Sequence, residues 1–123
     1  MATAGAAGAL ALAGCGGGST GGSDTVTVAS LNPMSGAYSS LGPSQRAGAK
    51  LARDQINDSD EYDIEIELVT GDTETEGGAA SEEATRLVQQ DGAEYMVGAI
   101  SSSVALGLNE FASQAEFIYF SGG

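Results

Sequence analysis

Residues 25–31 read Thr-Val-Thr-Val-Ala-Ser-Leu, an alternating β-branched run that predicts a strand. A loop over residues 32–42, punctuated by proline and glycine, follows this strand. Pro43 then stands in the first turn of a predicted helix over residues 44–57. One face of that helix carries the small and apolar residues Gly48, Leu51, Ala52 and Ile56. A strand, a loop and a helix in this order form the first half of a crossover unit.

The rest of the chain repeats this alternation. Strands are predicted at residues 63–70, 94–98 and 117–120, and helices from 75 or 77 to 90 and from 102 or 103 to about 114. The residues expected to face inward are Ala80, Ala84, Leu87 and Val88 on the first of these helices, and Val104, Leu106, Leu108 and Phe111 on the second. Because each crossover is long enough for parallel pairing, the sequence predicts an α/β lobe with helices on both faces of a parallel sheet.

Ligands of such sheets sit beyond the carboxyl ends of the strands, at the topological switch point. The loops expected at that edge are residues 32–42, 99–103 and 121–123, which are rich in Ser and Gly and contribute no acid–base pair. The chain has no histidine, its one cysteine lies near the start, and it lacks a Gly-x-Ser-x-Gly elbow. The edge therefore predicts binding rather than catalysis, with no cofactor.

Seventeen acidic residues against four basic ones give a net charge of −13. Such self-repulsion is tolerated where salt screens it, so the composition resembles that of halophilic, haloarchaeal proteins, although an ordinary acidic protein is the alternative. No basic stripe is present to release phosphate counterions, which makes nucleic acid an unexpected partner.

The first residues predict export. An apolar segment over residues 4–13 leads into Leu12-Ala13-Gly14-Cys15, and a Gly/Ser tether follows. We interpret residues 1–15 as a signal peptide with a lipobox, residues 16–24 as a linker and residues 25–123 as the binding domain. Cys15 would then be lipidated and would anchor the protein to the outer face of the cell membrane. The alternative is a disordered Ala/Gly leader with an incidental cysteine, and the export route stays open.

A family resemblance rests on three stretches. Residues 33–42 (Pro-Met-Ser-Gly-Ala-Tyr-Ser-Ser-Leu-Gly) with the helix after them, residues 67–72 with the helix after them, and residues 97–106 (Val-Gly-Ala-Ile-Ser-Ser-Ser-Val-Ala-Leu) occur in the right order and spacing. Together they resemble the leucine/isoleucine/valine-binding family, the extracytoplasmic substrate-binding proteins of ABC importers for branched-chain amino acids, amides and related solutes. The resemblance covers nearly everything from Val26 to Gly123.

The resemblance implies a Rossmann-like lobe of a type 1 periplasmic-binding-protein fold (βαβαβαβ), with the second lobe missing from this chain. It implies that Ser102, with Ser101 and Ser103 beside it, holds the carboxylate of the ligand. Free N–H groups and hydroxyls at a helix N-terminus suit an anion without any cation. Gly123 falls where the family uses a backbone N–H, and Tyr38 matches a tyrosine that packs beside the ligand.

Each of these features also has a simpler explanation. The three serines could form only a helix cap, and Tyr38 could be an exposed turn residue or a lid onto the core. Arg46, Lys50 and Arg53 share one helical face, which could dock a transporter but more simply pairs with nearby carboxylates. The acidic segment at residues 72–77, with Glu83, mimics the spacing of a calcium loop. A strand-to-helix loop with acids in the first turn explains it better.

The sequence thus favours a solute-binding lipoprotein that captures a neutral amino acid or amide between two lobes and delivers it to an ABC permease. A sensory ectodomain of the same fold is the alternative, and an α/β hydrolase-like or reductase fragment ranks behind both. The chain stops directly after the apolar run at residues 117–120, so we expect a truncated molecule.

Overall fold

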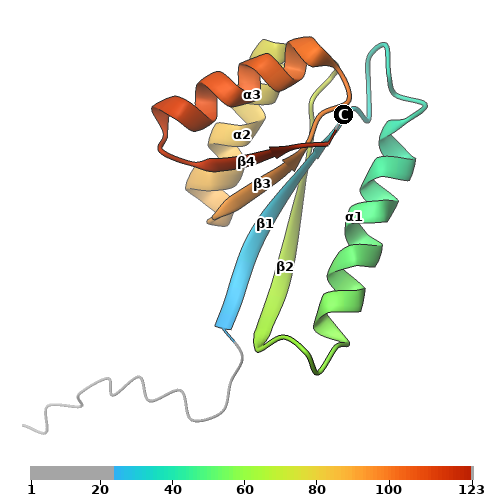
Figure 1. The fold of residues 1–123 in the computed structure, drawn as a ribbon. Helices are drawn as coiled ribbons and strands as arrows, with labels where there is room; N and C mark the ends of the chain where they lie inside the picture. The colour runs from blue at the N-terminus through green and yellow to red at the C-terminus, as the bar shows by residue number, and fades with distance from the viewer. Residues whose placement is uncertain (1–23, 123) are drawn as a thin grey trace, which may run out of the picture.

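A computed structural model describes residues 24–122 of the chain (Figure 1). Its elements are β1 (Asp24–Asn32), α1 (Gly42–Asn57), β2 (Ile64–Asp72), α2 (Gly77–Asp91), β3 (Tyr95–Gly98), α3 (Ser102–Gln114) and β4 (Ile118–Ser121). The predicted order of strands and helices is confirmed, and α2 and α3 begin at Gly77 and Ser102. The predicted signal peptide, the lipidation of Cys15 and the backbone donor Gly123 lie outside the described residues. Within those residues, no helix is long and apolar enough to cross a membrane.

The four strands form one sheet in the order β2-β1-β3-β4, and every pairing is parallel. The predicted parallel sheet is therefore confirmed. Helix α1 lies on one face of the sheet, while α2 and α3 lie together on the other face (Figure 1). The chain leaves β1 toward one face and β3 toward the opposite face, so the strand order reverses between these two neighbours. This point is the topological switch point of the sheet.

The hydrophobic core lies between the sheet and the pair α2–α3. Ala29 and Leu31 point into it from β1, Met96 points into it from β3, and all three are fully buried. Leu87 and Leu108 meet them from the two helices. Each fully buried leucine contributes about 2 kcal/mol relative to an exposed one, so this layer stabilises the fold.

The predicted inward residues of α2 and α3 are confirmed with one exception. Ala80, Ala84, Leu87, Val104 and Leu108 are buried, and Val88 and Phe111 pack against the core. Leu106 is 70% exposed, so its predicted place inside was wrong. The buried row of α3 runs through Val104, Leu108 and Ala112, four residues apart. Leu106 lies two residues from each of the first two, which places it on the far side of a helix with 3.6 residues per turn.

The apolar stripe of α1 does not pack on the sheet. Gly48 and Ala52 are exposed, Leu51 is 59% exposed, and only Ile56 of the four is half-buried. The half-buried side of α1 instead carries polar residues of its first turns, Gln45 and Arg46. This helix is therefore held by hydrogen bonds at both of its ends rather than by an apolar face: Gln45 and Arg46 bind the carboxyl ends of the strands, and Asn57 pairs with the backbone of Ile66 near the start of β2.

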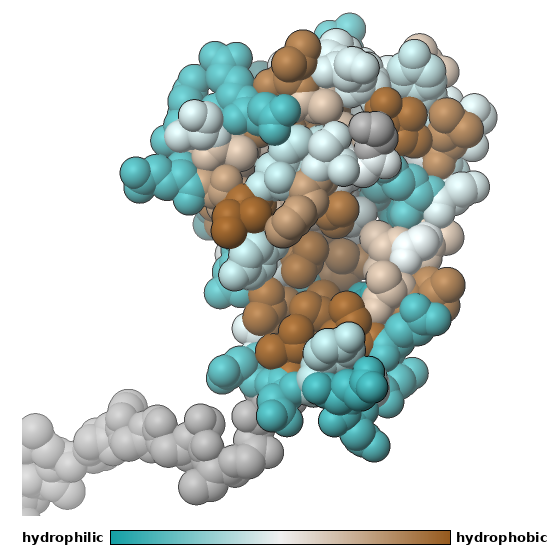
Figure 2. Space-filling view, viewed as in Figure 1, coloured by the Kyte–Doolittle hydropathy of each residue, from teal (hydrophilic) through white to brown (hydrophobic). Residues whose placement is uncertain are grey.

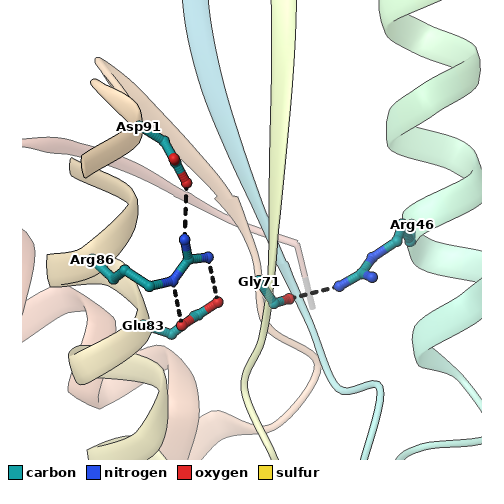
Figure 3. A network of polar contacts seen from close by, with 5 residues as sticks. All are labelled: Arg46, Gly71, Glu83, Arg86 and Asp91. Carbon is teal, nitrogen blue, oxygen red and sulfur yellow. Dashed lines mark hydrogen bonds and ion pairs between the residues drawn. The ribbon is translucent and has the colours of Figure 1, made fainter. Parts of the chain in front are cut away.

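On the face that carries α1, strands β3 and β4 are left largely uncovered. Ile118 and Phe120 of β4 are 54% and 58% exposed, and Tyr95 of β3 lies on the same face. Figure 2 shows apolar side chains gathered over this side of the molecule. On the other side, α2 carries an ion-pair cluster in which Arg86 donates to Glu83 and Asp91 (Figure 3). The hydrogen bonds from Arg86 hold the pKa of Glu83 below its usual value.

Two glycines give a matched test of this fold. Gly98 has a φ of +139°, and an added Cβ would overlap the carbonyl oxygen of Leu31, whereas a Cβ at Gly48 would meet no heavy atom within 4 Å among the described residues. We expect Gly98→Ala to lower the free energy of unfolding by more than about 2 kcal/mol. Gly48→Ala, in an exposed helix interior, should raise it by about 0.5–1 kcal/mol. Denaturant unfolding in high salt measures both, and equal effects of the two changes would contradict the β1–β3 geometry.

Candidate functional site

The carboxyl ends of the strands bring several polar loops to one edge of the sheet. Asn32 ends β1, Asp72 ends β2, Gly98 ends β3 and Ser121 ends β4. The loops that follow β1 and β3 flank the switch point, as the sequence predicts. The candidate site therefore lies at this edge, and its geometry depends on what fixes these loops.

A buried asparagine, Asn32, lies beneath the loops at this edge. Asn32 is fully buried, and its Oδ1 accepts a hydrogen bond of 3.0 Å from Ser30 Oγ and one of 3.3 Å from Arg46 Nε. Its Nδ2 donates to Gln45 Oε1 at 3.0 Å. A buried amide without partners would cost on the order of 1–3 kcal/mol, so these bonds are needed for Asn32 to be inside at all.

The same network ties α1 to the two strands beside β1. Arg46 Nη2 donates to the carbonyl oxygen of Gly71 at the end of β2, at 2.8 Å (Figure 3). Gln45 Nε2 donates to the carbonyl oxygen of Ala99, just past β3, at 3.2 Å. Arg46 shares a helical face with Lys50 and Arg53, and this face was expected to pair with carboxylates. That prediction was wrong for Arg46, which donates to Asn32 and Gly71 instead. Arg53 does pair with a carboxylate, that of Asp54.

Sequence reasoning missed Asn32 and Gln45 altogether. A polar residue that directly ends a β-branched strand was the available signal for Asn32. No comparable signal exists for Gln45, since a glutamine in a first helical turn is ordinary.

Three serines open α3. Ser101 occupies the N-cap position, with Ser102 and Ser103 in the first turn, and Ser101 Oγ and Ser103 Oγ lie 2.8 Å apart. Within the described residues, no side-chain hydrogen bond caps this helix. The first bond back to the cap is made by the N–H of Ala105 to the carbonyl of Ser101, so the N–H groups before it have no partner inside the helix. The helix start is thus uncapped, and its N–H groups can donate hydrogen bonds to an anion.

The connection from β3 to these serines is tightly held. Ala99 is buried and has a φ of +66°, a left-handed conformation that is costly for a residue with a Cβ. Its N–H donates to the carbonyl of Leu31 at 3.0 Å, while its own carbonyl accepts from Gln45. These two bonds hold Ala99 in a strained turn and direct the chain into the serines.

Tyr38 lies on the loop between β1 and α1, and 43% of its surface is exposed. Its N–H donates to Thr75 Oγ1 at 3.2 Å, so its loop lies beside the loop that precedes α2. At the start of α2, an added Cβ on Gly77 would come within 3.1 Å of the carbonyl oxygen of Ser103. The segment at residues 72–77 therefore contacts both the loop of Tyr38 and the first turn of α3, so all three loops belong to one edge.

Asp72 does not resemble a metal ligand here. Both of its carboxylate oxygens accept hydrogen bonds from the chain itself, from Met34, Ser35 and Glu74. Across residues 24–122 there is no group of three or more His, Cys, Asp or Glu that could hold a metal ion. The sequence predicts acidic residues in the first turn of α2, and this prediction was wrong. The helix begins at Gly77, so Glu74 and Glu76 precede that turn.

Comparison with protein families identifies the class. The chain belongs to the periplasmic binding protein family, whose model matches residues 25–123. A comparison with the curated proteins finds no match.

Solved structures of several substrate-binding proteins resemble this chain. The branched-chain amino acid transporter substrate-binding protein LivJ from Streptococcus pneumoniae, in complex with isoleucine, is 28% identical over 80% of this chain and 28% of its own, with a TM-score of 0.72. An amino acid ABC transporter substrate-binding protein from Pseudomonas fluorescens is 26% identical over 81% of this chain and 26% of its own, with a TM-score of 0.66. A putative branched-chain amino acid ABC transporter protein from Silicibacter pomeroyi is 25% identical over 80% and 25%, with a TM-score of 0.71. This chain thus spans about a quarter of the length of these relatives.

The hydrogen bonds of Asn32 can be tested by their effect on stability. Asn32→Ala removes the partner of Ser30, Gln45 and Arg46 at once, so the free energy of unfolding should fall by about 2–4 kcal/mol. The same change at exposed Asn109 on α3 serves as the control and should stay within about 0.5 kcal/mol of the unaltered chain. Chemical denaturation in high salt compares the two, and a small effect at Asn32 would show that the network does not hold the edge together.

Proposed function

We propose that this chain is the N-terminal lobe of an extracytoplasmic solute-binding protein of an ABC importer. It would capture branched-chain or other neutral amino acids, or related amides, for delivery to a membrane permease. The observation that carries this proposal is the uncapped start of α3, where Ser101, Ser102 and Ser103 stand at the switch point of a parallel sheet. The relative from Streptococcus pneumoniae was solved with isoleucine, which supports an amino acid as the ligand.

The chemistry of the helix start suits the carboxylate of such a ligand. Its oxygens would accept hydrogen bonds from the free N–H groups and hydroxyls of Ser102 and Ser103, and the helix dipole favours a negative charge there. The nearby cation Arg46 is already used by Asn32 and Gly71. The site would therefore hold an anion through backbone and hydroxyl donors alone, which allows it to work in a chain of net charge −13.

Two further residues complete the proposed wall of the site. Tyr38 would lie against the ligand from the β1–α1 loop, and the backbone N–H of Gly123, outside the described residues, would donate a further hydrogen bond. An acidic group that binds the ligand's ammonium would come from a second lobe, and closure of the two lobes would bury the ligand. The protein itself would perform no chemical step.

The position of the protein in the cell is part of the same proposal. Residues 1–15 would be a signal peptide, and lipidated Cys15 would anchor the domain at residues 25–123 through the linker at residues 16–24. Anchoring at the outer face of the membrane would place the loaded protein within reach of its permease.

A titration with L-isoleucine tests this proposal. In high salt, NMR spectra of the isotope-labelled 123-residue chain should show amide shift changes concentrated at Ser101, Ser102, Ser103 and Tyr38. Binding should be weaker than micromolar, because one wall of the cleft leaves most of the ligand surface in water. The amine 2-methylbutylamine, which is isoleucine without its carboxylate, should leave the serine amides unchanged.

A pair of variants provides the control. Ser102→Ala should reduce the shift changes, whereas the same change at Ser113, exposed at the far end of α3, should not. Shift changes confined to the opposite edge of the sheet, or a micromolar dissociation constant for this chain alone, would contradict the proposed site.

A further inference from the structure

The carboxylate of Asp72 is the centre of a second polar cluster, which holds the loop that carries Tyr38. Its Oδ1 accepts hydrogen bonds from the N–H groups of Met34 at 2.8 Å, Ser35 at 3.2 Å and Glu74 at 2.9 Å. Its Oδ2 accepts one from Ser35 Oγ at 2.7 Å. Three of these four donors belong to the β1–α1 loop, which is 37 or 38 residues away in the sequence. One side chain at the end of β2 therefore fixes the start of a loop that follows β1.

Thr75 adds a reciprocal contact between the same two loops. Its Oγ1 donates to the carbonyl oxygen of Ser35 at 3.1 Å and accepts from the N–H of Tyr38 at 3.2 Å. The loops are also in close contact, because an added Cβ on Gly36 would overlap the carbonyl oxygen of Glu74. The segment from Met34 to Tyr38 is thus attached to residues 72–75 at both of its ends.

The supporting loop is itself held in an unfavourable conformation. Glu74 and Thr75 have φ values of +53° and +61°, in the left-handed region that residues with a Cβ rarely adopt. Each such residue costs on the order of 1 kcal/mol and persists only where surrounding bonds fix it. Here those bonds come from the side chains of Asp72 and Thr73, which accept from the N–H groups of Glu74 and Thr75.

From this geometry we propose that Asp72 is a positioning residue, which holds the Tyr38 loop against the site in the absence of ligand. The ligand-binding part of this inference rests on the proposed function, whereas the positioning itself does not. A loop that is already in place loses less conformational freedom when a ligand arrives, so preorganisation strengthens binding. Asp72 touches no ligand in this arrangement and acts through Met34, Ser35 and Tyr38.

A charged carboxylate suits this task better than an amide. Asparagine offers one acceptor oxygen and an NH₂ group, whereas the four donors around Asp72 need two acceptor oxygens. Bonds to an ionised acceptor are also about twice as strong as neutral ones. Partial burial alone would raise the pKa of Asp72, but the hydrogen bonds from Glu74, Ser35 and Met34 lower it below its ordinary value.

Charged groups on α1, on α2 and in the loop itself lie near Asp72. Glu83 on α2 faces Asp72 and repels its charge, but Arg86 binds Glu83 and offsets this. From α1, Arg46 donates to Gly71, the residue before Asp72. Glu74 is exposed in the loop itself. Asp72 therefore stays ionised through mild acid, and its bonds to the loop are lost only as the pH falls through its lowered pKa.

Hydrogen exchange of single amides tests the positioning role without any ligand. In Asp72→Asn, the amide of Ser35 should exchange at least about tenfold faster than in the unaltered chain. The amide of Met34, which also donates to the carbonyl oxygen of Asn32 at 3.0 Å, should exchange faster by a smaller factor. The amides of Ala29 and Leu31 in β1 should keep their rates. The matched control is Asp63→Asn, which removes the same charge from an exposed residue and should leave all four rates unchanged. Unchanged rates at Met34 and Ser35 in Asp72→Asn would overturn the proposal.

A pH titration of the unaltered chain gives a second readout that does not require the variant to fold. The amide proton shifts of Met34, Ser35 and Glu74 should move together, with one midpoint below the ordinary pKa of aspartate. Separate midpoints, or a common midpoint at or above the ordinary value, would overturn the proposal.

An isoleucine titration of Asp72→Asn separates this inference from the proposed function. We expect the shift changes at Ser102 to persist while those at Tyr38 are lost. If isoleucine binds neither protein, the proposed ligand fails, and the exchange and pH results still decide whether Asp72 holds the loop. If Asp72→Asn keeps the full response at Tyr38, the proposed positioning role is wrong.

Discussion

The arrangement of this binding edge depends on one buried side-chain amide. Asn32 ends the central strand β1, and its Oδ1 and Nδ2 are satisfied by Ser30, Gln45 and Arg46. Because an unpaired buried amide is costly, the first turn of α1 must lie where Gln45 and Arg46 can reach it. The same two residues then bind Gly71 and Ala99, so one cluster fixes the ends of β1, β2 and β3. Among residues 24–122 no buried side-chain polar atom is left without a partner.

The open donors of the site follow from this constraint. Gln45 holds Ala99 in a left-handed turn, and the chain then enters α3 through three serines whose hydroxyls do not cap the helix. A helix start with free N–H groups attracts anions through short-range dipoles, an effect that a strongly acidic protein retains because it requires no cation. On the other side, Asp72 and Thr75 connect the loop of Tyr38 to the start of α2, which contacts Ser103. Polar contacts thus fix the three loops that follow β1, β2 and β3.

Much of the fold was predictable from local pattern, because β-branched alternation and helical periodicity report burial on one face. The same kind of pattern was misleading on α1. Its apolar stripe predicts that Leu51 packs on the sheet, but Leu51 is exposed, and Gln45 and Arg46 hold the helix through hydrogen bonds. The position of the three serines at the start of α3 was predictable, because the sequence pattern changes there from that of a strand to that of a helix. The contact between Asp72 and Met34 was not, because it joins residues 38 apart. Its acceptor is an aspartate, which is ordinary in a turn, and its donor is a backbone N–H, which any residue but proline supplies.

We propose that the serine-bearing start of α3, held in place from below by the Asn32 network, binds the carboxylate of a small amino acid. A crystal structure of the protein grown with saturating L-isoleucine tests it most directly. We expect a ligand carboxylate within hydrogen-bonding distance of the Ser102 and Ser103 amides, with Gln45 still bound to Asn32 and Ala99 beneath it. A structure in which the chain's own side chains fill this helix start, and isoleucine lies elsewhere, would contradict it.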